Sequence, residues 1–154
     1  MHQSYEEKKK ILQERIKQAK GDISLKKSTS NLFRHRKKAQ QRLNVKKFTN
    51  VLEVNTKKEY VEVEGMTTYQ KLVDETLKYG YLPAVVPELK TITIGGAATG
   101  IGIESTSFKY GLVHESIIEY EILLPDGSVV QASPSKNKDL FYAFPNSYGT
   151  LGYV

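Results

Sequence analysis

The groups of this sequence that could do chemistry are main-chain amides of a glycine-rich segment, residues 87–111. The segment reads PELKTITIGGAATGIGIESTSFKYG and holds five of the eleven glycines of the chain. Most of its other residues are small, hydroxylated or β-branched. A glycine-rich main chain that turns sharply can direct several N–H dipoles at one anion, which is typical of a phosphate site. We therefore expect the chain to fold around a nucleotide-like ligand.

The spacing of these glycines excludes the two commonest phosphate-binding loops. No G-x-x-x-x-G-K-[ST] is present, because no Lys-Ser or Lys-Thr pair follows glycines at the required distance. Gly100-Ile101-Gly102 opens a G-x-G pattern, but Ser105 stands where G-x-G-x-x-G needs glycine, and no helical pattern follows. A tight structural turn between two strands explains a glycine-rich run equally well, so the spacing leaves both alternatives open.

Reactive side chains form no recognisable catalytic pattern. The chain has no cysteine, which excludes disulfides, thiolate catalysis and Cys-ligated metal. Its histidines, at positions 2, 35 and 114, lack the spacing of metal ligands, and no G-x-S-x-G is present. We therefore name no catalytic residue and no metal site. His35 is interpreted as an exposed basic residue, and His114 as structural or exposed.

Periodicity and turn signals predict the elements that must position the glycine segment. They are a helix over 1–20, a short strand at 23–25, a hairpin over 51–64, a helix that Thr67 caps together with Gln70 and that Gly80 ends, a hairpin over 115–131 and a helix over 139–144. The second helix should bury Leu72, Val73, Thr76 and Leu77, and the last one Phe141 and Phe144. Two strands followed by a helix indicate an α+β fold rather than βαβ repeats.

The net charge of +6 raises the question of an anionic partner. From Lys26 to Lys47 there are basic residues and no acidic ones, which could follow a nucleic-acid backbone. Aromatic interleaving beyond Phe33 and Phe48 is missing, however, and no nucleic-acid-binding motif is present, so we expect no nucleic acid. We find no apolar run long enough for a membrane span and no signal-peptide pattern, and we expect a soluble, cytoplasmic domain.

A resemblance to a known family begins in the glycine segment. TIGGAATGIGIESTSFKYGL resembles the flavin-binding segment of the vanillyl-alcohol-oxidase and p-cresol-methylhydroxylase superfamily, and most of all its 24-dehydrocholesterol reductase (Diminuto-like) branch. The similarity covers residues 21–154 and continues in VLEVNTKK, LPDGSVV, SPSKNKDLFYAFP and SYGTLGY. It implies an FAD-binding domain of the PCMH type, α+β, with mixed or antiparallel sheets flanked by helices. Residues 1–20 would form a separate helix before this domain.

The resemblance also implies which residues bind the cofactor, FAD. They are Thr93, Ile94, Gly95, Gly96, Ala97, Ala98, Thr99, Gly100, Ile101, Gly102, Ile103, Glu104 and Ser105 in the segment, Ser28, Thr29, Ser30 and Asn31 in a loop after the first strand, and Gly149. The Gly95-Gly96 pair would approach the pyrophosphate. That loop lacks the Gly and the Gly-His pair usual in the family. Glu104 has two interpretations, which are acceptance of a ribityl hydroxyl and a salt bridge to Lys109.

The activity implied by the resemblance is that of an FAD-dependent oxidoreductase. Hydride would pass between the flavin and a carbon of a hydrophobic, sterol-like substrate. Family members continue into a substrate domain, so we expect this chain to be an inactive amino-terminal part of a longer protein, with Tyr153 and Val154 as an unpaired edge. The alternatives are a flavin-free binding module of the same fold and, less favoured, a basic nucleic-acid-binding domain.

Overall fold

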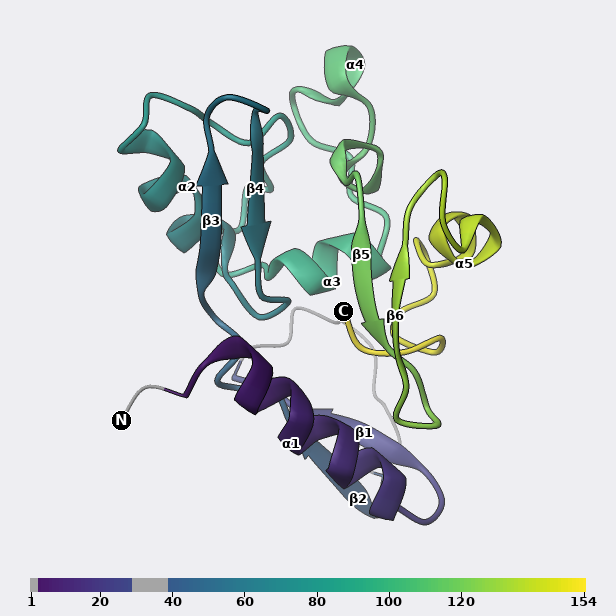
Figure 1. The fold of residues 1–154 in the computed structure, drawn as a ribbon. Helices are drawn as coiled ribbons and strands as arrows, with labels where there is room; N and C mark the ends of the chain where they lie inside the picture. Colours follow the sequence, from purple (N-terminus) through teal and green to yellow (C-terminus); the bar gives the residue numbers. More distant parts are fainter. Residues whose placement is uncertain (1–2, 29–38) are drawn as a thin grey trace.

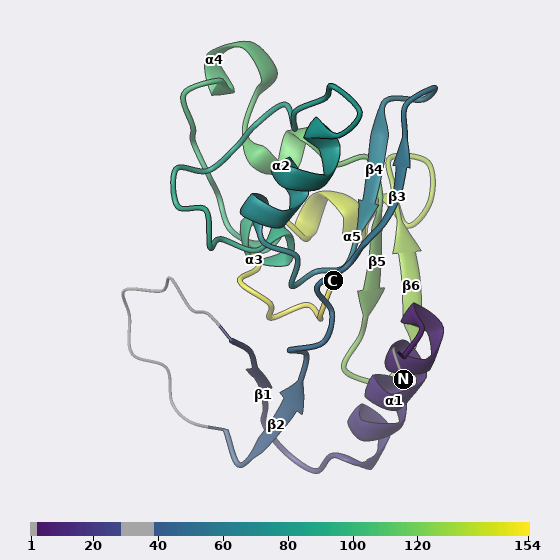
Figure 2. The ribbon, with the colours of Figure 1, turned by 90° about the vertical axis from the view of Figure 1, so that its left-hand side faces the viewer.

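The fold consists of helices and short pairs of strands, and no large sheet forms in the part of the chain that the structure describes. The computed structural model describes residues 3–28 and 39–154. Its strands form three separate two-stranded sheets, one parallel and two antiparallel. Figure 1 and Figure 2 show these sheets around a short central helix, α3 (Ile94–Thr99). The α+β class predicted from the sequence is confirmed.

The first helix, α1 (Tyr5–Gln18), lies across the parallel pair β1 (Ile23–Lys26) and β2 (Gln41–Asn44) (Figure 1). Ser4 and Glu7 form a capping box at its start, in which each side chain accepts a hydrogen bond from the other residue's amide. The predicted helix over 1–20 is confirmed within these shorter bounds. Its buried side joins a core cluster formed by Leu12, Ile16, Leu43, Val45, Phe48, Met66 and Leu123.

The parallel pair was only half predicted. The strand expected at 23–25 is present as β1, and it pairs with β2 in a register that sets Ile23 beside Gln41. We did not predict β2, because its sequence QRLN has a single apolar side chain and no alternation. The connection between the two strands contains the predicted loop residues Thr29, Ser30 and Asn31, which lie outside the described residues.

The hairpin predicted over 51–64 is confirmed as β3 (Val51–Asn55) and β4 (Tyr60–Val63), and α2 (Tyr69–Leu77) follows it. The predicted cap was wrong by one residue. Thr68 is the N-cap and accepts from the Lys71 amide, while the Thr67 hydroxyl donates to the Asn50 carbonyl. The predicted burial of Leu77 was also wrong. Leu77 is exposed, since the helix buries the face carrying Tyr69, Leu72 and Thr76.

The glycine segment holds a helix that its composition did not predict. Thr93 caps α3 by accepting from the Gly96 amide. Glycine inside a helix costs about 1 kcal/mol relative to alanine, and this short helix contains two. Tertiary contacts offset that cost, because Ala97 and Ala98 are buried and the first turn bonds to the end of the β3–β4 hairpin. The chain then runs irregularly to α4 (Ser107–Tyr110).

The C-terminal third forms the hairpin β5 (Tyr120–Leu123) and β6 (Val129–Ala132), with α5 (Lys138–Ala143) beside it. Phe141 and Phe144 are buried as predicted. The hairpin is shorter than the predicted 115–131, because a 3-10 helix, η1 (Val113–Ser116), takes up the start of that range.

The expectation of an unpaired edge at Tyr153 was wrong. Its amide donates to the Leu123 carbonyl at 2.9 Å, and its carbonyl accepts from the Leu123 amide at 2.7 Å. The final residues therefore extend the β5 side of the hairpin and return toward α3 (Figure 2). Val154 lies against Gly65 and Gly95; a Cβ at Gly65 would lie 1.9 Å from the Val154 carbonyl oxygen, and one at Gly95 would lie 3.1 Å from its Cγ1.

Candidate functional site

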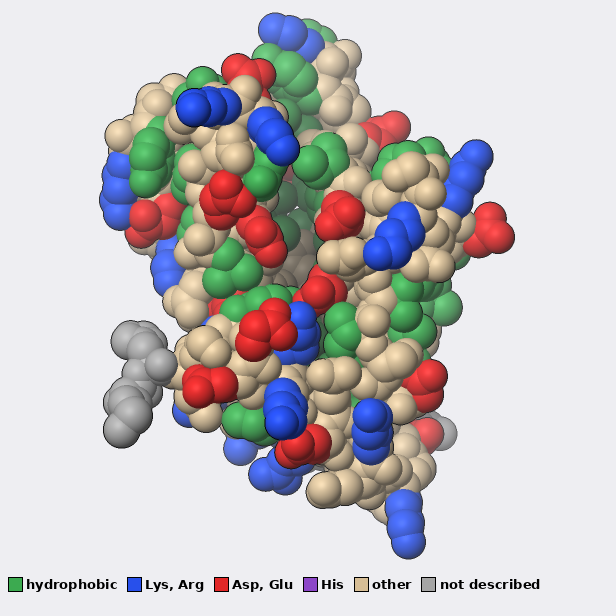
Figure 3. All heavy atoms as spheres, viewed as in Figure 1, with side chains coloured by type: hydrophobic (Ala, Val, Ile, Leu, Met, Phe, Trp, Pro, Cys, Tyr) green, Lys and Arg blue, Asp and Glu red, His purple; other side chains and the backbone are tan. Residues whose placement is uncertain are grey.

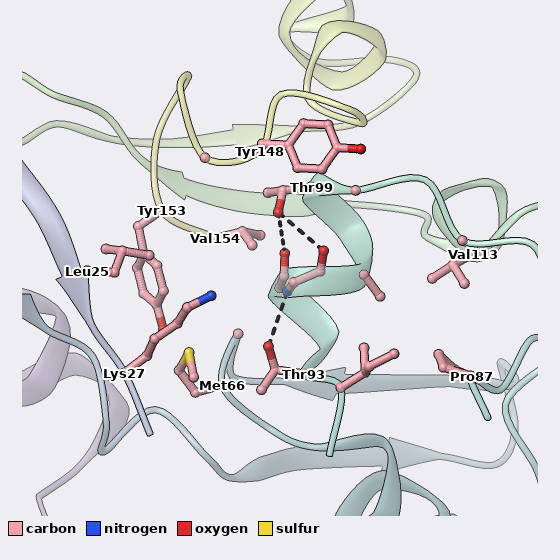
Figure 4. A pocket seen from close by; sticks show the side chains of 18 of the residues that line it. Leu25, Lys27, Met66, Pro87, Thr93, Thr99, Val113, Tyr148, Tyr153 and Val154 are labelled. Carbon is pink, nitrogen blue, oxygen red and sulfur yellow. Dashed lines mark hydrogen bonds between the residues drawn. The ribbon is translucent and has the colours of Figure 1, made fainter. Parts of the chain in front are cut away.

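A cavity of about 230 Å³ runs along α3. Its walls come from five parts of the chain, namely the end of β1, the end of the β3–β4 hairpin, the segment around Pro87 and Ile92, the glycine segment with Val113, and the C-terminal residues (Figure 4). These parts are far apart in the sequence, so the cavity exists only once the whole chain has folded.

Most of the predicted site residues line this cavity. The lining ones are Thr93, Gly95, Gly96, Ala97, Thr99, Gly100, Ile101, Gly102, Glu104 and Gly149. Four segment residues do not contribute to its wall: Ile94 packs against a core cluster, Ala98 is buried in another, and Ile103 and Ser105 are exposed. Ser28 is exposed and lies outside the lining. The role of these residues in binding stays a prediction.

The amides of Gly95 and Gly96 are not bare, which corrects the picture of an open main chain at this pair. The Gly95 amide donates to the Gly65 carbonyl at 2.8 Å, and the Gly96 amide donates to the Thr93 hydroxyl at 3.2 Å. A donor already used inside the fold gains little from a ligand, because the internal bond must break first. The pair therefore shapes the wall rather than supplying donors.

Close packing explains why Gly95 is a glycine. A Cβ added there would lie 2.7 Å from the Gly65 carbonyl oxygen, a contact that real Cβ atoms do not make. A Cβ at Gly96 would meet only the Thr93 hydroxyl, at 3.0 Å. Gly95 thus lets α3 dock on the end of the β3–β4 hairpin, and this contact fixes one wall of the cavity.

Unused main-chain donors occur one turn later, at residues 101–103. Within the described ranges, the amides of Ile101, Gly102 and Ile103 have no hydrogen-bond partner, whereas the Gly102 carbonyl accepts from Val113 at 3.3 Å. This stretch matches the original expectation of a bare main chain better than Gly95-Gly96 does. Three consecutive residues with free N–H groups can serve acceptor atoms of a ligand.

Glu104 stands at the same end of the cavity. Its amide bonds to the Ser107 hydroxyl at 3.0 Å, and its carboxylate makes no ion pair within the described part of the chain. The predicted alternative, a bridge to Lys109, is therefore not found; the Lys109 ammonium lies over the Tyr110 ring instead. Burial, and secondarily the charge of Glu104, raises the pKa of Tyr69.

Lys27 and Tyr153 line the other end of the cavity, and sequence reasoning missed both. Figure 4 shows the Lys27 ammonium and the Tyr153 hydroxyl on the same side of the group of lining residues. Lys27 directly precedes the predicted loop residue Ser28, and Tyr153 belongs to the SYGTLGY stretch of the resemblance, so signals for both were present. A single lysine or tyrosine has no spacing pattern, so the sequence alone does not mark either residue as part of a site.

The surface charge gives no support to a nucleic-acid track on the face shown in Figure 3. Lys and Arg side chains there alternate with Asp and Glu rather than forming a continuous basic stripe. Among the residues that the structure describes, no cluster of metal-ligating side chains occurs. None of the described helices combines the length and apolarity needed to cross a membrane.

Sequence comparison decides the family to which this fold and cavity belong. A family model described as an FAD binding domain matches residues 5–133. The chain belongs to this family. FAD is accordingly its cofactor, and the PCMH-type domain expected from the resemblance is confirmed.

Curated relatives agree with the sterol-reductase branch. The chain is 47% identical to human Delta(24)-sterol reductase over 105 residues, which are 68% of this chain and 20% of that protein. It is 39% identical to the Delta(24)-sterol reductase of Pisum sativum over 108 residues, 70% of this chain and 19% of that one. The chain thus spans about a fifth of the length of these relatives.

Solved structures show the same fold at low sequence identity. The 6-hydroxy-D-nicotine oxidase of Arthrobacter nicotinovorans superposes with a TM-score of 0.75 at 17% identity, covering 95% of this chain and 31% of that one. A carbohydrate oxidase from Microdochium nivale gives 0.67 at 24% identity, covering 73% and 24%.

The cavity has the size and the lining residues to hold a part of an FAD molecule. Sites that enclose a whole ligand usually measure about 300–1,000 Å³, so a cavity of about 230 Å³ holds a portion of the dinucleotide. The two ends differ in charge, because Lys27 is cationic and Glu104 anionic. The Lys27 end suits a diphosphate, and the Glu104 end suits hydroxyl or ring N–H groups together with acceptors for the amides of Ile101 and Gly102.

Proposed function

We propose that this FAD-binding domain serves a flavin-dependent oxidoreductase that transfers hydride between the flavin and a carbon of a hydrophobic, sterol-like substrate. The observation that carries the proposal is the cavity along α3, which has Lys27 at one end and the free amides of Ile101 and Gly102 in its lining at the other. Bound FAD supplies the redox chemistry itself. The chain's own residues bind the cofactor, orient it and set the charge around it.

Within this proposal the two ends of the cavity have different tasks. The Lys27 ammonium attracts the diphosphate and fixes its end of the cofactor. The amides of Ile101 and Gly102 donate to acceptor atoms farther along, and the Glu104 carboxylate accepts from a ribityl hydroxyl. The remaining predicted contacts, at Ser28–Asn31, at 93–105 and at Gly149, belong to the same proposal.

The sterol-like substrate is supported by identity to Delta(24)-sterol reductases of animals and plants. No described residue forms a nucleophile or base pattern beside the cavity, which agrees with chemistry supplied by the cofactor. We propose that the substrate is selected by parts of the enzyme that correspond to the unmatched length of these relatives. We also propose that this chain alone binds FAD without turning over substrate.

The test is a flavin titration of the chain and of two neighbouring lysine variants. Lys27 lines the cavity, whereas Lys26 is exposed and does not, so Lys26→Gln is a matched control. We expect Lys27→Gln to raise the FAD dissociation constant about tenfold, because a charged contact to phosphate is worth about 1.5–3 kcal/mol. Lys26→Gln should stay within about twofold, as expected for a surface substitution.

The measurement is quenching of flavin fluorescence, repeated at two salt concentrations. Affinity of the unchanged chain should fall with salt, and that of Lys27→Gln should fall less, because one phosphate contact is lost. A colourless chain that takes up no FAD would contradict the proposal and favour a flavin-free module of the same fold. Equal affinities of the two variants would remove Lys27 from the site.

A further inference from the structure

The hydroxyl of Tyr153 is a buried polar group without a partner. Its oxygen is shielded from solvent and has no hydrogen bond with any residue in the described ranges, 3–28 and 39–154. The tyrosine lines the cavity at the end that carries Lys27, and Figure 4 shows its hydroxyl directed toward the Lys27 and Met66 side chains. Buried hydroxyls normally have partners, so this one needs an explanation.

The rest of Tyr153 is held in place, which fixes the position of its hydroxyl oxygen. Its main chain is bonded to Leu123 in both directions. Its ring stacks edge to face on Phe48, with the centroids 5.7 Å apart and the planes at 77°. The fold therefore holds the oxygen of an unsatisfied hydroxyl at one place in the cavity lining, which is an arrangement expected where a ligand completes the bond.

The surroundings define the kind of atom that this donor can meet. Burial and the charge of Glu64 raise the pKa of Tyr153, so it remains a neutral O–H donor at all ordinary pH values. Glu64 is not its partner, because no hydrogen bond joins the two side chains; the Glu64 carboxylate accepts from Lys8 and from the Asn50 amide instead. With Lys27 at the same end, the position suits an anionic oxygen.

We propose that Tyr153 is a specificity-determining residue that donates its hydroxyl hydrogen bond to a phosphate oxygen of FAD, beside Lys27. The inference rests on the proposed function and deepens it. It assigns the Tyr153 side chain a role in distinguishing FAD, which has a diphosphate, from riboflavin, which has none.

Tyr120 provides a matched control for this proposal. Its hydroxyl is also buried and unpartnered among the described residues, but its ring packs in a core cluster with Phe141 and Phe144 and does not line the cavity. Tyr→Phe at either position removes one oxygen that has no partner in the protein. Neither substitution should lower the melting temperature of the chain without flavin.

The experiment compares the unchanged chain, Tyr153→Phe and Tyr120→Phe in titrations with FAD and with riboflavin. We expect Tyr153→Phe to weaken FAD binding about tenfold while leaving riboflavin binding within about twofold, because only the phosphate contact is lost. Tyr120→Phe should match the unchanged chain with both ligands. Melting temperatures without flavin check that both variants fold.

The outcomes separate this inference from the proposed function. If the unchanged chain binds FAD and Tyr153→Phe binds it equally well, the role of Tyr153 is wrong while the proposed function stands. Equal losses for FAD and riboflavin would also overturn it, since they would point to a packing defect. If the unchanged chain binds no FAD at all, the proposed function fails, and this inference fails with it.

Discussion

Lys8 and Glu64 form a buried ion pair that ties α1 to the residue just before the cavity wall. Both side chains are almost completely shielded from water. Lys8 also donates to the Lys47 carbonyl, and Glu64 accepts from the Asn50 amide, so three chain segments meet at this pair. A buried charge is costly unless it is paired, so each partner depends on the other.

Removing one partner of the Lys8–Glu64 pair should therefore strongly destabilise the fold. We expect Lys8→Ala to lower the free energy of unfolding by about 3–5 kcal/mol, because the Glu64 carboxylate remains buried without its cation. Lys78→Ala, at the exposed pair with Glu75, should cost about 0.5 kcal/mol or less. Urea denaturation of both variants measures the difference, and a small effect of Lys8→Ala would show that the pair is open to solvent.

The α3 helix shows how an unfavourable sequence is held in one conformation. Two glycines weaken it, while the Thr93 cap, the docking of Gly95 on Gly65 and the buried Ala97 and Ala98 stabilise it. The helix carries one wall of the cavity, and it leads directly into the free amides of 101–103. Its stability and the affinity for FAD should therefore change together.

Thr93→Ala tests this link at the helix cap. The hydroxyl that accepts from the Gly96 amide is lost, which should lower the free energy of unfolding by about 1 kcal/mol. Thr91 is exposed, and Thr91→Ala should stay within about 0.5 kcal/mol. Denaturation and FAD titration of both variants check this prediction. An unchanged free energy of unfolding for Thr93→Ala would mean that the cap does not stabilise α3.

Elements with a regular pattern were predictable, and elements held by tertiary contacts were not. The β3–β4 hairpin and the α1 periodicity could be read directly, whereas β2 and α3 could not. In β2 the decisive contact is pairing with β1, and in α3 it is the Thr93 cap with docking on Gly65. Local propensity does not contain such contacts.

The sequence predicted which segment forms the site, but not which residues from other parts of the chain join it. The resemblance selected 93–105, and most of those residues line the cavity. The functional difference between Gly95-Gly96, whose amides are used internally, and 101–103, whose amides are free, depends on hydrogen bonds that only the fold reveals. Lys27 and Tyr153 join the site through the β1–β2 pair and the bridge to Leu123.

At the scale of the whole molecule, the cavity lies where three core clusters meet. Met66 belongs to the cluster under α1, Ala97 and Val113 belong to the cluster beside α2, and Val154 packs against the cluster of β5, β6 and α5. The wall positions are therefore set by the packing of the entire domain. A ligand that bridges them should stabilise the fold by mass action.

A ¹⁵N NMR titration of this 17.4 kDa chain with FAD tests most directly whether the cavity along α3 holds the cofactor, because it reports every amide separately. The amides of 101–103, Lys27 and Tyr153 should shift on addition of FAD, while Gly95 and Gly96 keep the slow hydrogen exchange of bonded amides. Shifts confined to distant elements such as α5, or no shifts at all, would contradict the central claim that this cavity holds the cofactor.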